Sequence, residues 1–152
     1  MLDLNYLAEE YVKCYSDKTR IYMIEHFLKT YDATQKKEVQ YMLFPRQKDL
    51  CNALGTGNNV VTTKPRQAGI TTTCGGFISC EIVLASKDEP LTILVIGNTL
   101  DLAQQMVKKI RDFLYNFLLG FGEMNILKKV KIQHYHLQKN SYLIFVIQKS
   151  WF

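Results

Sequence analysis

Apolar residues recur every three or four positions in three stretches of the chain, which is the spacing of helices that bury one face. These stretches are residues 4–15, 19–31 and 99–119. Either Asp17 or Thr19 can cap the start of the second stretch, because both side chains accept hydrogen bonds from backbone N–H groups. A further helix is predicted over residues 45–54, since Pro45 loses no hydrogen bond as the first residue of a helix.

Strand patterns occur in three other places. Residues 39–43 alternate between apolar and polar or smaller side chains, which predicts a short strand. Residues 91–96 form a nearly continuous apolar run, typical of a strand that is buried on both faces in a parallel sheet. Residues 130–148 indicate a hairpin. Together with a helix predicted over 70–85, this order favours an α/β fold with a largely parallel sheet and flanking helices.

The stretch from residue 60 to residue 73 predicts a short β-branched strand, a tight polar loop and the first turn of a helix. This is the layout of a phosphate-binding loop with the pattern G-x-x-x-x-G-K-[ST]. Gly69 and Thr71 occupy the positions of the second glycine and the hydroxyl. Lys64 stands where the first glycine belongs, and Ile70 stands where the lysine belongs.

A nucleoside triphosphate needs inward backbone N–H groups, a helix N-terminus, one cation and a hydroxyl for Mg²⁺. Gly69 permits close backbone approach, Thr71 places a hydroxyl at the helix start, and the two threonines after it are spare donors. Ile70 cannot supply the cation, but Lys64 or Arg66 can supply it from the other end of the loop. The alternative is a strand-to-helix turn that carries a glycine and several capping threonines.

Size and composition fit one globular domain of 152 residues, 47% of them hydrophobic and 22% charged. No apolar run reaches the roughly 18 residues of a membrane span, and the first residues do not resemble a signal peptide. The net charge of +5 suits contact with a polyanion. No CxxC spacing occurs among the cysteines, which favours buried free thiols in a reducing cytosol over a metal site. They are Cys14, Cys51, Cys74 and Cys80.

The loop over residues 64–72, K-P-R-Q-A-G-I-T-T, resembles the deviant Walker A motif of tailed-phage large terminase subunits, the motor ATPases of DNA packaging. Loops of that family commonly read x-S-R-Q-x-G-K-[ST]-T, and in some members the lysine sits at the first loop position. Residues 21–27 resemble the family's Y-F-I-E-N-Y helix, and residues 43–50 resemble its L-x-x-x-Q-x-x-x-L segment. The resemblance runs from about residue 15 to residue 120.

This resemblance implies a P-loop NTPase-like fold with ATP and Mg²⁺ as cofactors. Gln47 would contact adenine, Lys64 would contact the β- and γ-phosphates, and Arg66 would trigger hydrolysis, which makes Lys64 and Arg66 the implied catalytic residues. Thr71 would bind the metal. The rest of the implied nucleotide-binding loop is Gln67, Ala68, Gly69, Ile70, Thr71 and Thr72. The alternatives are a surface glutamine, a solvated lysine at a strand end and an arginine paired with a surface carboxylate.

Hydrolysis by this architecture also needs a Walker B strand that ends in Asp and a catalytic Glu after it. Glu123 is the last acidic residue, and the apolar run at 142–147 is followed by Gln148 and Lys149. We therefore expect the chain to stop before the Walker B acids and the nuclease domain, through truncation, a split gene or a reading-frame change. His134 and His136 lie two apart without an acidic or cysteine partner after them, so no metal site is predicted there.

The resulting expectation is a helical N-terminal segment over residues 1–38 and a partial P-loop ATPase domain over 39–152. The resemblance implies phage double-stranded DNA, the portal protein and the small terminase subunit as partners, with a homo-oligomeric ring in the full-length protein and no membrane. It implies the cytoplasm of an infected bacterial cell as the location. Two alternatives stay open: a helicase-like or other P-loop nucleotide-binding fragment, and an α/β interaction module that binds no nucleotide.

Overall fold

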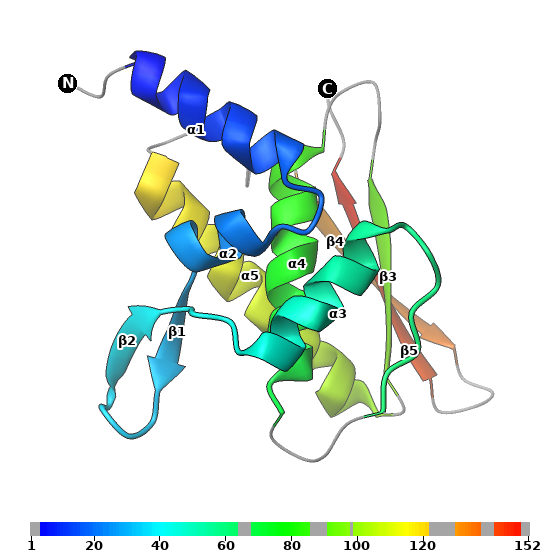
Figure 1. Ribbon diagram of the computed structural model, residues 1–152. Helices are drawn as coiled ribbons and strands as arrows, with labels where there is room; N and C mark the ends of the chain where they lie inside the picture. Colours follow the sequence, from blue (N-terminus) through cyan, green and yellow to red (C-terminus); the bar gives the residue numbers. More distant parts are fainter. Residues whose placement is uncertain are drawn as a thin grey trace. The chain divides into compact units, whose positions relative to one another are not determined.

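The computed structural model describes residues 4–63, 68–85, 91–97, 99–121, 130–137 and 142–149 (Figure 1). The chain divides into two compact units, Met1–Phe77 and Ile78–Phe152, whose boundary falls within one helix. The fold mixes helices and strands, as predicted. The predicted division into residues 1–38 and 39–152 stays a prediction. None of the helices in the described part of the chain has the length and apolar character that crossing a membrane requires.

The first unit consists of helices and one small hairpin. Its elements are α1 (Leu4–Ser16), α2 (Ile21–Phe27), β1 (Lys29–Asp32), β2 (Lys37–Gln40), α3 (Pro45–Gly55) and the first part of α4 (Ile70–Leu84). The N-cap residue of α2 is Arg20, which makes no side-chain cap of its own. Both predicted side chains nevertheless bind N–H groups of the first turn: Asp17 accepts that of Tyr22 at 2.9 Å, and the Thr19 hydroxyl accepts that of Ile21 at 3.4 Å. Pro45 begins α3, as predicted.

The predicted helix over residues 19–31 is wrong at its end, because α2 stops at Phe27. Leu28 is fully buried in an extended conformation, and β1 pairs antiparallel with β2 from Lys29↔Gln40 to Asp32↔Lys37. The predicted strand over 39–43 is likewise displaced toward the N-terminus. Asp32 closes the hairpin by accepting the N–H groups of Thr34 and Gln35 at 2.7 and 3.1 Å, a turn that polar side chains favour.

The second unit contains a three-stranded sheet with the order β3-β5-β4 (Figure 1). Its strands are β3 (Thr92–Gly97), β4 (Val130–Leu137) and β5 (Tyr142–Lys149). The predicted hairpin is confirmed, with β4 and β5 antiparallel from Val130↔Lys149 to Leu137↔Tyr142. The prediction of a largely parallel sheet is wrong for the described strands, because β5 also runs antiparallel to β3 and every described pairing is antiparallel.

Helix α5 (Leu100–Phe121) packs on β3 and β5 and forms the core of the second unit. This core contains Ile82, Val95, Ala103, Val107, Ile110 and Leu114. Only one face of β3 belongs to it, since Leu94 and Ile96 on the other face are 55% and 57% exposed. The predicted burial of this strand on both faces is therefore wrong.

Candidate functional site

The loop that the sequence singles out is described only at its edges. Residues 64–67, which include the predicted site residues Lys64, Arg66 and Gln67, lie outside the described residues. Residues 60–63 have no regular secondary structure, so the predicted strand before the loop is wrong. Ala68 and Gly69 lead directly into α4, whose first residue is the predicted Ile70.

Gly69 forms a tight turn immediately before α4. Its φ of 73° lies in the left-handed region, which a residue with a side chain enters only at a cost. A Cβ atom at this position would collide with Nε2 of Gln47. The side chain of Gln47 therefore lies directly against the backbone of Gly69. The predicted close approach of a phosphate to Gly69 stays a prediction.

Gln47 lies on the first turn of α3 and is only 5% exposed. Its Oε1 accepts the N–H of Phe44 at 3.0 Å, and its Nε2 donates to the carbonyl of Ala68 at 3.2 Å. These partners fix the orientation of the amide, because only the oxygen can accept the N–H of Phe44. An amide has two N–H donors and two acceptor lone pairs, so one of each is not used by these two bonds.

Three consecutive threonines begin α4 and have different environments. Thr71 is exposed, Thr72 is partly buried, and Thr73 is fully buried. The Thr73 hydroxyl lies 2.9 Å from the Tyr41 hydroxyl and donates to the Gly69 carbonyl at 3.1 Å. Thr73 is therefore a structural residue that ties Tyr41 to the turn, and its prediction as a spare phosphate donor is wrong. The exposed hydroxyl of Thr71 keeps the access that its predicted role needs.

Replacing Thr73 with valine is expected to lower the free energy of unfolding by about 1–3 kcal/mol, because the hydrogen bonds of the buried hydroxyl to Tyr41 and to the Gly69 carbonyl are lost with little change in volume. Urea unfolding followed by circular dichroism measures this. The double variant Tyr41→Phe/Thr73→Val should lose less than the sum of the two single variants, since each single change removes the same hydroxyl pair. Additive losses would show that the two hydroxyls do not interact, and Thr72→Val serves as the control.

A pocket of about 700 Å³ lies beside this turn, entirely within the first unit. It is lined by Phe44, Pro45, Arg46, Gln47, Asp49, Leu50, Ala53, Val60, Thr62, Thr63, Ala68 and Ile70. Its volume falls within the range of roughly 300–1,000 Å³ for small-molecule sites. The walls come from α3 and from both described edges of the loop, so the predicted residues Gln47, Ala68 and Ile70 share one pocket.

Two buried groups of the first unit are uncharged at neutral pH. Burial raises the pKa of Cys51 to about 12, and burial also raises the pKa of Tyr41 against the opposing effect of its hydrogen bond to Thr73. Cys14, Cys51 and Cys80 are buried free thiols, as predicted, while Cys74 is partly buried. Within the described residues, no group of three or more His, Cys, Asp or Glu side chains is arranged to hold a metal ion.

The sequence pattern indicates no site role for Tyr41, which contacts Thr73 next to the turn, or for Glu25 and Lys48, which form an ion pair between α2 and α3. The sequence indicates Glu25 and Lys48 only indirectly, because they lie within residues 21–27 and 43–50, the two segments that resemble flanking motifs of the terminase family. No family model, curated protein or solved structure matches this chain.

Proposed function

We propose that this chain binds ATP with Mg²⁺ at the pocket between α3 and the N-terminus of α4. The observation that carries the proposal is the contact of Gln47 with Ala68 and Gly69. A base-reading amide and a phosphate loop must lie together in a nucleotide site, and these residues are more than twenty positions apart in sequence. The N-terminus of α4, where Thr71 is exposed, supports the proposal, because helix N-terminal N–H groups favour phosphate.

In this proposal the chain is the N-terminal part of a P-loop motor ATPase of the large terminase type. Lys64 supplies the cation to the β- and γ-phosphates, Arg66 acts in hydrolysis, and Thr71 binds Mg²⁺. DNA, the portal protein and the small terminase subunit are the partners of such a motor.

Titration of the chain with a fluorescent ATP analogue tests the proposal. We expect saturable binding that strengthens with Mg²⁺ and is reversed by unlabelled ATP, because the metal bridges the phosphates to the Thr71 hydroxyl. A signal that unlabelled ATP does not displace would reflect the fluorophore alone. The absence of saturable binding would contradict the proposal and favour an interaction module that binds no nucleotide.

A further inference from the structure

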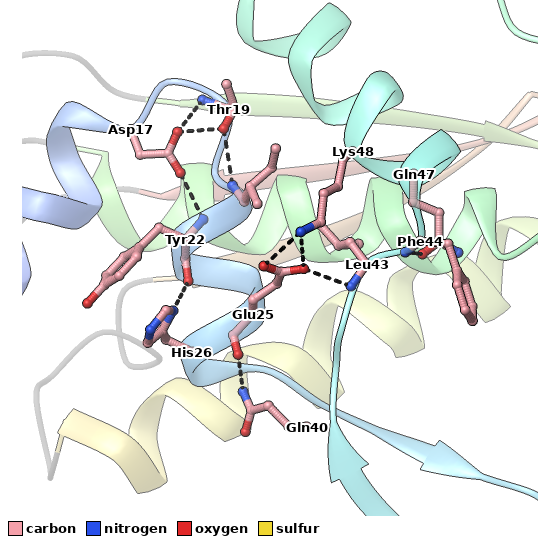
Figure 2. A network of polar contacts seen from close by, with 11 residues as sticks. Asp17, Thr19, Tyr22, Glu25, His26, Gln40, Leu43, Phe44, Gln47 and Lys48 are labelled. Atoms are coloured by element: carbon pink, nitrogen blue, oxygen red, sulfur yellow. Dashed lines mark hydrogen bonds and ion pairs between the residues drawn. The ribbon is translucent and has the colours of Figure 1, made fainter.

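A carboxylate on α2 reaches the start of α3 in the first unit. Lys48 Nζ lies 2.9 Å from Glu25 Oε1 and 3.2 Å from Oε2. Glu25 Oε1 also accepts the N–H of Leu43 at 3.0 Å. Figure 2 shows the carboxylate between the Lys48 ammonium and the Leu43 backbone. The Glu25 side chain is only 14% exposed and the Lys48 side chain is 40% exposed, so water is excluded from the carboxylate more than from the ammonium.

Two consecutive backbone N–H groups at the entry to α3 are therefore held by side chains. Leu43 donates to Glu25, and Phe44 donates to Gln47, at 3.0 Å in both cases (Figure 2). Lys48, the partner of Glu25, directly follows Gln47 in sequence. Glu25 therefore binds the chain on both sides of Gln47 in sequence. It accepts the backbone N–H of Leu43 before Gln47 and pairs with the ammonium of Lys48 after it.

The same region of the chain also contacts α4. A Cβ atom added to Gly76 would lie 3.2 Å from Leu28 Cδ1 and 3.6 Å from Ile24 Cγ1, so these two side chains press against the α4 backbone. Ile24 precedes Glu25 within α2, and both Ile24 and Leu28 are fully buried. Helix α2 therefore contacts α3 through Glu25 and contacts α4 through Ile24.

We propose that Glu25 is a positioning residue for Gln47, which it holds against the Ala68–Gly69 turn where the proposed nucleobase would contact it. Glu25 itself does not touch the ligand. Its ion pair and backbone hydrogen bond fix the first turn of α3, and α2 fixes that turn against α4. The expected effect of Glu25 on affinity rests on the proposed nucleotide binding. The placement of Gln47 by Glu25 can be measured without any nucleotide.

The test compares Glu25→Ala and Glu25→Gln with Glu38→Ala, which removes an exposed carboxylate on β2. In the nucleotide-free chain, nuclear magnetic resonance of the Gln47 side-chain amide reports its environment. Equilibrium titrations then give the affinities for MgATP and for magnesium tripolyphosphate, a probe without a base. We expect E25A to shift the Gln47 amide and to weaken MgATP binding about fivefold, the effect of one hydrogen bond, with tripolyphosphate binding unchanged.

The Glu25→Gln variant keeps an acceptor for the Leu43 N–H and should restore most of the MgATP affinity. An unchanged Gln47 amide in E25A would overturn the positioning role whether or not nucleotide binds. Equal losses for MgATP and tripolyphosphate would also overturn it, because a general structural effect does not select the base. If the wild-type chain binds neither probe, the proposed function fails, while the amide resonance still decides whether Glu25 places Gln47.

Discussion

Replacing Gly69 with alanine is expected to lower the free energy of unfolding by about 2–4 kcal/mol. About 1 kcal/mol comes from forcing a residue with a side chain to adopt the φ of 73° found here. Roughly 1–3 kcal/mol comes from displacing the buried amide of Gln47, which loses its hydrogen bonds to Phe44 and Ala68 when it clears the new Cβ. Urea unfolding followed by circular dichroism measures the total.

Gly57 provides the matched control for this experiment. Its φ of 74° is nearly identical, but no atom lies within 4 Å of a Cβ built on it. Gly57→Ala should therefore cost only the conformational part, about 1 kcal/mol. The double variant Gln47→Ala/Gly69→Ala should lose less than the sum of its single variants, since the collision is gone. Equal losses in G57A and G69A would show that Gln47 does not lie against Gly69.

Replacing Lys64 with alanine is expected to weaken MgATP binding by about 10- to 100-fold, the effect of a hydrogen bond to a charged group. The physical reason is that Ile70, at the usual lysine position, is apolar, so the proposed site depends on the cation from the start of the loop. The fluorescent-ATP titration measures the loss. Lys37→Ala removes an exposed lysine from β2 and should leave the affinity unchanged.

The displaced-lysine hypothesis also predicts a rescue. In the Lys64→Ala/Ile70→Lys variant, the cation returns to the usual lysine position in the first turn of α4, so part of the lost affinity should return. Arg66→Ala tests the second loop cation in the same titration. Unchanged affinity in both K64A and R66A would contradict a phosphate site in this loop. If K64A keeps the wild-type affinity for MgATP and the double variant binds more tightly, Ile70→Lys has created a new site.

The sequence predicted the local features of the site more successfully than their long-range partners. The helix beginning at Ile70, the turn at Gly69 and the start of α3 at Pro45 follow from glycine and proline chemistry within a few residues. The hydrogen bond between the Tyr41 and Thr73 hydroxyls joins residues 32 positions apart, and no periodicity of apolar residues predicts it. The family resemblance implies that Gln47 contacts adenine, which stays a prediction. The contact of Gln47 with Ala68 and Gly69 was not predicted, because pattern analysis cannot bring two separate helices together.

The errors in the fold have the same physical origin. Apolar spacing through Phe27 and Leu28 fits a longer helix, but Tyr41 donates its N–H to the Leu28 carbonyl at 2.9 Å and continues an extended pairing. A continuous apolar run such as β3 fits either strand direction, and the direction was decided by β5, which lies between β3 and β4. Tertiary pairing therefore overrode local preference in both places.

The most direct test of ATP binding at this site is a titration of the isotope-labelled chain with MgATP, followed by nuclear magnetic resonance. We expect saturable shifts at the Gln47 side-chain amide and at the backbone amides of Gly69 and Thr71, with Asp32 in the hairpin turn unaffected. Magnesium tripolyphosphate should shift Gly69 and Thr71 and leave Gln47 unchanged. Shifts absent from all three residues at saturating MgATP, or confined to other parts of the chain, would contradict ATP binding at this site.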